Sequence, residues 1–137
     1  MWFVEGADAE RIAATVGCFA PDRHADLWAG AGLAAAYAGG GPVESVARLQ
    51  ELAGEHAIDM AQGAAFAAEA RRRAGNPVPH CDAACHVLCG MTADAAASIA
   101  REESVGLVPD DTHPQYEAWR RRIQKRISLT IGPRIPV

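Results

Sequence analysis

The residues of this chain with the greatest capacity for covalent chemistry lie in one short stretch, which holds His80, Cys81, Cys85 and Cys89. The three cysteines follow one another at intervals of four residues, so on a helix they form a single stripe. A helix that begins near Pro79 places Cys81 in its first turn, where the helix N-terminus lowers the pKa of a thiol. With His80 as its base, Cys81 or Cys85 would then be a thiolate nucleophile.

Two other interpretations of this stretch are open, a metal site and simple burial. A zinc site usually takes pairs of ligands from two segments, whereas here all the soft ligands share one predicted helix, so we expect no metal. Free cysteine is among the most frequently buried residue types, and the pattern favours burial in the core. The N-terminus has neither the basic region nor the long apolar run that directs secretion. We therefore expect a cytoplasmic chain whose four cysteines are free thiols.

Three further side chains are candidates for binding a ligand. Gln62 and Glu69 lie seven residues apart in a largely apolar segment, so they share one face of a helix. A buried polar side chain needs a hydrogen-bond partner, and a bond to a neighbouring helix is the interpretation we favour. The alternative is a pocket for an apolar small molecule, to which Trp28 would contribute. His24 and His56 are interpreted as solvated side chains at helix ends.

The last part of the chain is basic, although the net charge of the whole is -4. Six of the thirteen basic residues follow His113, against one acidic residue. Their helical segment is predicted to be a solvated face that pairs with the acidic body, and its alternative role is to dock an acidic partner protein. No aromatic platform accompanies these cations, so nucleic acid is not expected as a partner. The candidates for partner binding are Arg120, Arg121, Arg122, Lys125 and Arg126.

The elements that must position these residues are helices. Glycine and proline divide the chain into segments of helical length, with Asp8 and Thr92 as N-caps and Gly75 and Gly90 as stops. No apolar run reaches the length of a membrane span. We predict an all-α domain over residues 1–130, with about six or seven helices in packed antiparallel hairpins. Residues 106–111 are expected to form a loop and residues 131–137 a flexible tail.

An internal similarity links two of the predicted helices. The pattern DLxxGxxLAA at residues 26–35 recurs as DMxxGxxFAA at residues 59–68, an offset of 33 residues. This offset is close to the length of a helix-turn-helix repeat, and chance similarity between two alanine-rich helices is the alternative. In either case the small residues Gly30 and Gly63 are expected to let a neighbouring helix approach closely.

Several stretches together resemble a known bacterial family. They are WFVEG (2–6), DLWAGAGLA (26–34), AQGAAFA (61–67), AGNPVPH (74–80), CHVLCG (85–90) and WRRRI (119–123). As a set they resemble the C-terminal half of the UnbL-like enediyne biosynthesis proteins, whose genes lie beside polyketide synthase genes. The likeness covers nearly the whole chain, but members of that family are more than twice as long. The resemblance implies a context of natural-product biosynthesis and no catalytic residues, because the family has no assigned reaction.

From these observations we expect an accessory or binding protein of an enediyne-type polyketide pathway. It would hold an apolar intermediate or dock a partner, and apolar surface left by a missing half would favour self-association. One alternative is an enzyme of the same pathway that uses His80 with Cys81 or Cys85. The other is a structural fragment with no separate activity. No cofactor is expected in any of these cases.

Overall fold

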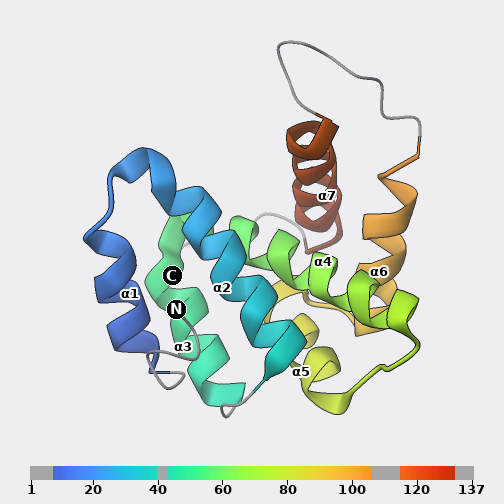
Figure 1. Ribbon diagram of the computed structural model, residues 1–137, viewed down its shortest axis with the longest axis horizontal. Helices are drawn as coiled ribbons and strands as arrows, with labels where there is room; N and C mark the ends of the chain where they lie inside the picture. The colour runs from blue at the N-terminus through green and yellow to red at the C-terminus, as the bar shows by residue number, and fades with distance from the viewer. Residues whose placement is uncertain (1–7, 40–42, 106–114, 132–137) are drawn as a thin grey trace.

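The computed structural model describes residues 8–39, 43–105 and 115–131. These residues form seven α-helices and two short 3-10 turns, with no strand among them, which confirms the predicted all-α class (Figure 1). The elements are α1 (Ala9–Gly17), η1 (Pro21–Arg23), α2 (His24–Ala38), α3 (Val43–Ala53), η2 (Gly54–His56), α4 (Ala57–Ala74), α5 (Pro79–Cys89), α6 (Ala93–Glu102) and α7 (Gln115–Ile131). The expected loop at 106–111 and residues 132–137 of the expected tail lie outside the described residues, and Ile131 belongs to α7.

The helix ends follow from local chemistry. The side-chain oxygens of Asp8 and Thr92 each accept a hydrogen bond from the backbone N–H of the third residue that follows, and so cap α1 and α6. Gly75 and Gly90 end α4 and α5 with φ of 72° and 70°, in the left-handed region that favours glycine. Pro21 begins the 3-10 turn η1, and α2 begins after it at His24.

Helix α4 lies at the centre of the molecule, with α2, α5, α6 and α7 packed around it (Figure 1). Between Ala57 and Glu69 all but two of its residues are buried. Most of them are alanine, so neighbouring helices approach its backbone closely and the core is built from small and aliphatic side chains. Helices α1 and α3 pack together beyond α2, on the side away from α7.

The backbones of α2 and α4 touch where they cross. A Cβ atom on Gly63 would lie 2.0 Å from the carbonyl oxygen of Ala29, and one on Gly32 would lie 2.1 Å from that of Met60. The close approach expected at Gly63 is therefore confirmed. The one expected at Gly30 is wrong, because Gly30 is exposed and no atom lies within 4 Å of the place where its Cβ would be. Gly32, two residues after Gly30 and on another face of α2, makes the close approach to α4 instead.

Helices α2 and α4 run in the same general direction. Near their N-terminal ends the rings of His24 and His56 lie 6.2 Å apart, and near their C-terminal ends the guanidinium of Arg71 donates to the carbonyl oxygen of Tyr37. The two helix starts thus meet on one side of the molecule, where α7 also packs against α4. Polar side chains from all three helices come together there.

In the described part of the chain, no single helix has both the length and the apolar character to cross a membrane, and α5 with α6 would do so only as a pair bent by 70°.

Candidate functional site

A pocket of about 320 Å³ lies between α2, α4 and α7, and we call it the α2–α4–α7 pocket. One wall is apolar and includes Leu33 and Phe66, and the other is polar and includes Asp26, Gln62 and Arg120. Leu33 is 39% exposed although it is a large aliphatic residue. The size is within the range of small-molecule sites, which combine an apolar lining with a few polar groups that fix the orientation of a ligand.

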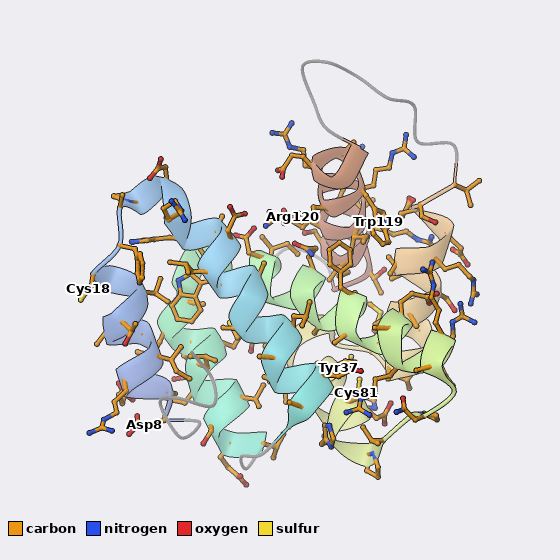
Figure 2. All side chains as sticks on the ribbon, in the orientation of Figure 1. Asp8, Cys18, Tyr37, Cys81, Trp119 and Arg120 are labelled. Carbon is orange, nitrogen blue, oxygen red and sulfur yellow. The ribbon has the colours of Figure 1, made fainter. Side chains whose placement is uncertain are left out.

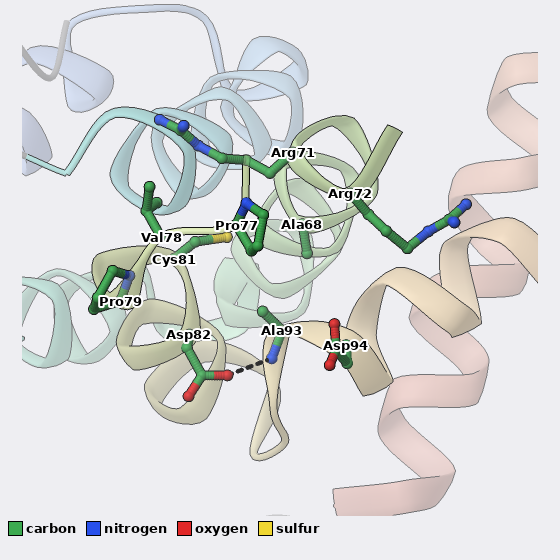
Figure 3. A pocket seen from close by; sticks show the side chains of 10 residues that line it. All are labelled: Ala68, Arg71, Arg72, Pro77, Val78, Pro79, Cys81, Asp82, Ala93 and Asp94. Carbon is green, nitrogen blue, oxygen red and sulfur yellow. Dashed lines mark hydrogen bonds between the residues drawn. The ribbon is translucent and has the colours of Figure 1, made fainter. Parts of the chain in front are cut away.

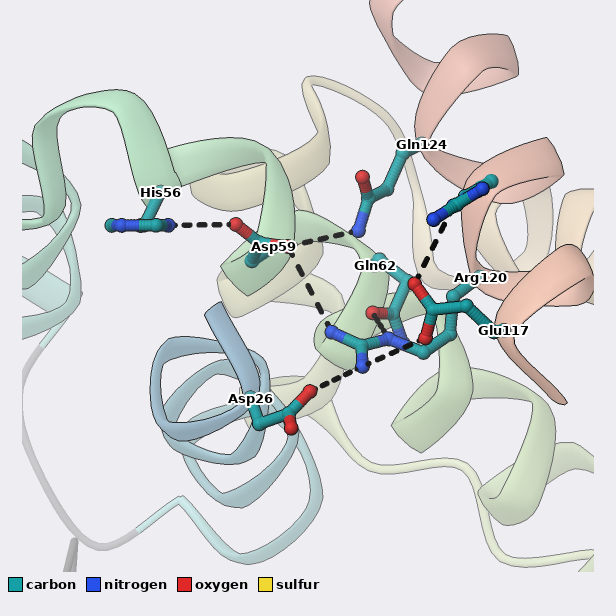
Figure 4. Close-up of polar contacts among 8 residues, drawn as sticks. Asp26, His56, Asp59, Gln62, Glu117, Arg120 and Gln124 are labelled. Carbon is teal, nitrogen blue, oxygen red and sulfur yellow. Dashed lines mark hydrogen bonds and ion pairs between the residues drawn. The ribbon is translucent and has the colours of Figure 1, made fainter. Parts of the chain in front are cut away.

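Arg120 organises the polar wall (Figures 2 and 4). Its side chain reaches from α7 toward the starts of α2 and α4 and is only 6% exposed. Its Nε donates to Oε1 of Gln62 over 2.8 Å, and its Nη1 donates to Oδ1 of Asp26 over 2.5 Å. The carboxylates of Asp59 and Glu117 lie 3.8 Å and 3.6 Å from its Nη2 and Nη1. A buried guanidinium requires such partners, because an unpaired charge in the interior is strongly destabilising.

Asp59 extends this network toward α3. Its side chain is buried, and its two oxygens accept from different elements. Oδ1 accepts from Nε2 of Gln124 over 3.0 Å, and Oδ2 accepts from Nδ1 of His56 over 3.0 Å (Figure 4). His56 is therefore half-buried and held in place by Asp59, which corrects the expectation of a solvated side chain.

The amide nitrogen of Gln62 is the one buried side-chain nitrogen or oxygen atom of the described residues that has no hydrogen-bond partner. The orientation of the amide is fixed, because a guanidinium has no acceptor and the Nε–H of Arg120 must meet the oxygen of Gln62. An unsatisfied buried donor costs about 1–3 kcal/mol. A ligand atom that accepts a hydrogen bond from this nitrogen would remove that cost.

The charges around Gln62 limit what this ligand atom can be. Three carboxylates, those of Asp26, Asp59 and Glu117, surround the single guanidinium of Arg120. A further anion would be repelled by them, so a neutral carbonyl or hydroxyl oxygen fits the pocket better than a carboxylate or phosphate does.

The prediction that Arg120 belongs to an exposed docking surface is wrong, because its guanidinium lies inside the molecule. Its position held a signal for this burial. Arg120 precedes Ile123 by three residues and Ile127 by seven, and both isoleucines are fully buried. On α7 it thus shares the stripe that faces the core.

The other four predicted partner-binding residues lie at the surface of α7. Arg121 pairs with a carboxylate of its own helix, Arg126 pairs with one on α6, and Arg122 donates to a backbone carbonyl just after α6. Lys125 is exposed. These contacts match the favoured interpretation, in which the basic face pairs with the acidic body. Docking of an acidic partner stays a prediction.

The three predicted ligand-binding residues do not share one site. Gln62 lines the α2–α4–α7 pocket and bonds to another helix, as favoured. Glu69 is buried, but its carboxylate is held by Arg72 and Arg73 of its own helix. Hydrogen bonds from Arg72 lower the pKa of Glu69 more than its burial raises it, and those from Arg73 add to the effect. Trp28 is buried beside a different cavity. The prediction that Glu69 lines a pocket with the other two is therefore wrong.

The cysteine stripe of α5 faces the core. Cys81, Cys85 and Cys89 are all buried, and the thiols of the last two contact backbone carbonyls of α4. The hydrogen bond with Cys85 raises the pKa of Cys81, and burial raises it further. For Cys85, the bond with Cys81 lowers the pKa, but the bond with Cys89 and burial together raise it above its ordinary value. The expected lowering of the Cys81 pKa is therefore wrong, because the pKa of both thiols lies above the ordinary value.

His80 is turned away from these thiols. Its Nε2 bonds to the carbonyl oxygen of Tyr37 at the end of α2 over 2.9 Å, and its ring packs against Gly39. His80 and the three cysteines therefore share one helix, but the imidazole of His80 is not placed to act as a base for a thiol. Burial in the core, the favoured interpretation, accounts for the stripe.

Thiol labelling tests this description of the cysteines. In the folded protein we expect maleimide to modify Cys18 alone, because Cys18 is exposed at the end of α1 (Figure 2) and the other three are buried. Mass spectrometry should show one label in native buffer and four in denaturant, and none in native Cys18→Ser. Fast modification of Cys81 or Cys85 in the native protein would restore the nucleophile hypothesis.

A second pocket lies beside Cys81, between the end of α4 and the starts of α5 and α6 (Figure 3). It measures about 370 Å³, and three of its four charged side chains already have partners. Arg71 lies over the ring of Tyr37, and Arg72 holds Glu69. Asp82 accepts from the backbone N–H of Ala93 over 2.8 Å. This arrangement stabilises the helix ends and leaves little for a ligand to bind.

Comparison with known proteins identifies the family to which the chain belongs. A family model described as a protein of unknown function (DUF1702) matches residues 1–127. No curated protein and no solved structure gives a significant match. Because the match covers most of its length, the chain belongs to the DUF1702 family.

Proposed function

We propose that this chain is a binding protein that holds an apolar small molecule in the α2–α4–α7 pocket, through a neutral oxygen atom that accepts from Gln62. The amide nitrogen of Gln62 carries this proposal, because it is buried without a partner and is held in one orientation by Arg120. The sequence resemblance to the UnbL-like enediyne biosynthesis proteins extends the proposal to a polyketide intermediate as the ligand. Polyketide chains combine a hydrocarbon backbone with carbonyl oxygens, which is the combination that the pocket requires.

The apolar wall supports the same ligand class. The ring of Phe66 packs against that of Trp119, with 4.5 Å between their centroids. The indole Nε1 of Trp119 donates to the carbonyl oxygen of Ala100 over 2.7 Å, which anchors the pair to α6. Leu33 of α2 lines the same pocket as Phe66. A flat hydrocarbon would cover these side chains and bury apolar surface that is now accessible to water.

The naphthyl ketone Prodan is a suitable probe, because it joins an apolar ring system to one carbonyl and its emission shifts to the blue in apolar surroundings. We expect saturable binding to the native protein. Leu33→Ala and Gln62→Glu should each weaken it about threefold to tenfold, the value of a partly buried aliphatic contact or of one hydrogen bond. In its ionised form, glutamate at position 62 still accepts from Arg120 but donates nothing to the ketone, so the comparison is made at a pH where its carboxylate is ionised.

Two controls separate this site from non-specific binding. Leu129→Ala removes an exposed leucine from α7 outside the pocket and should leave Prodan binding unchanged. The parent dimethylaminonaphthalene, which lacks the ketone, should bind the native protein and Gln62→Glu equally well. Equal affinity of Prodan for the native protein and for both pocket variants would contradict the proposal.

A further inference from the structure

A third cavity, separate from the α2–α4–α7 pocket and from the pocket beside Cys81, lies between α1, the start of α2 and the end of α3. We call it the α1–α3 cavity. It measures about 520 Å³, and its inner wall is apolar, with Val16, Trp28 and Leu52 among its lining residues. Two imidazole side chains, those of His24 and His56, line the same space. A cavity that joins an apolar wall to titratable groups is a candidate binding site in its own right.

The orientation of His56 leaves one nitrogen for a ligand. Its Nδ1 donates to Asp59 over 3.0 Å, and the other oxygen of that carboxylate is held by Gln124. Because Nδ1 carries the proton of the neutral ring, Nε2 has a free lone pair. The exposed carboxylate of Glu55 lies 3.8 Å from this Nε2. The carboxylate of Asp59 thus fixes the tautomer of the neutral His56 ring and leaves Nε2 as a hydrogen-bond acceptor.

The remaining neighbours of His56 do not compete for its Nε2. The ring of His24 meets that of His56 edge-on, with 6.2 Å between the centroids. His24 is itself held by its Nε2, which donates to the carbonyl oxygen of Phe19 over 2.9 Å. The cavity-lining residues of α1 are uncharged. Among the residues that the structure describes, the charged or titratable groups that face His56 are therefore Asp59, Glu55 and His24.

From this geometry we propose that the α1–α3 cavity binds an apolar molecule that carries a weakly acidic hydroxyl group, a phenol or an enol. The hydroxyl donates to Nε2 of His56. When the proton moves, the O–H bond breaks, an N–H bond forms and the electron pair stays on oxygen, which leaves a phenolate beside an imidazolium. Asp59 is a positioning residue for this step. The proposal does not depend on the α2–α4–α7 pocket, which uses Gln62 and a neutral acceptor.

The probe for this site is 4-nitrophenol, whose anion is yellow and whose neutral form is nearly colourless. In a buffer below the pKa of the free phenol, we expect the native protein to raise the yellow absorbance in a saturable way. His56→Asn keeps an N–H that can reach Asp59 but has no Nε2. This variant should reduce the increase in yellow absorbance about tenfold, which corresponds to a change of one unit in the pKa of the bound phenol. His24→Gln keeps the bond to Phe19 and should retain the gain.

A second pair of variants tests the cavity without touching a polar group. Ala13 lines the cavity, whereas Ala14 is exposed and does not. Ala13→Leu should abolish the gain, and Ala14→Leu should preserve it, with circular dichroism to confirm that both variants fold. The ether 4-nitroanisole, which has no acidic proton, should bind the native protein and His56→Asn equally well.

The outcomes are distinct from those of the Prodan experiment. Leu33→Ala should leave the nitrophenolate signal unchanged, so failure at one site does not entail failure at the other. The proposal is overturned if the native protein gives no saturable gain, if His56→Asn gives the native gain, or if Ala13→Leu and Ala14→Leu behave alike.

Discussion

Gly63→Ala is expected to destabilise the protein by about 3 kcal/mol, the upper end of the usual range for overpacking a core. The added Cβ would lie 2.0 Å from the carbonyl oxygen of Ala29 and 2.9 Å from the backbone nitrogen of Leu33. Both contacts are with backbone, so no side chain can rotate away and the two helices must separate. Gly32→Ala should act in the same way through the carbonyl of Met60, at 2.1 Å.

Gly30→Ala is the matched control, because Gly30 lies in α2 with Gly32, and its Cβ would meet no atom within 4 Å. It should stabilise the protein by up to about 1 kcal/mol, since alanine is the better helix former. Urea denaturation gives the free energy of unfolding for all three variants. If Gly63→Ala and Gly30→Ala were equally stable, the direct backbone contact between α2 and α4 would be refuted.

Arg120→Met should cost about 3–5 kcal/mol, the range for breaking a buried ion pair by removing one partner. Methionine keeps much of the volume of the side chain but leaves the carboxylate of Asp59 and the oxygen of Gln62 without their guanidinium. Arg120→Lys should recover only part of the loss, because an ammonium cannot present several N–H groups in the fixed directions that a guanidinium does.

The neighbouring Arg121→Met is the control for this effect. Arg121 is 61% exposed and pairs only at the surface, so its loss should change the free energy of unfolding by less than about 1 kcal/mol. Thermal and urea unfolding of the two variants measure the difference. Equal stability of Arg120→Met and Arg121→Met would mean that the side chain of Arg120 is solvated, as the sequence alone had indicated.

The local structure was predictable because it depends on residues close together in the chain. Capping by Asp8 and Thr92 needs only a hydroxyl or carboxylate three residues before a backbone N–H, and the left-handed ends at Gly75 and Gly90 need only a glycine. The end of α4 at Ala74, directly before the predicted stop at Gly75, agrees with the structure for the same reason.

The candidate site was only partly predictable, because its contacts join distant residues. Arg120 and Gln62 are 58 positions apart, and Arg120 and Asp26 are 94 apart. The sequence identified Gln62 as a buried polar residue that needs a partner, but it gave four arginines and one lysine as equal candidates in the basic segment. Which of them reaches Gln62 depends on how α7 packs against α4, and a helical pattern does not fix that packing.

The side-chain amide of Gln62 offers the most direct test of the ligand pocket. In a ¹⁵N-edited NMR titration with Prodan, we predict that the Nε2 proton signals of Gln62 shift downfield in step with the fluorescence change. The parent dimethylaminonaphthalene, which has no ketone, should leave them nearly unmoved. Saturable binding of Prodan with no change in the Gln62 amide signals would contradict the assignment of this nitrogen as the hydrogen-bond donor to the ligand.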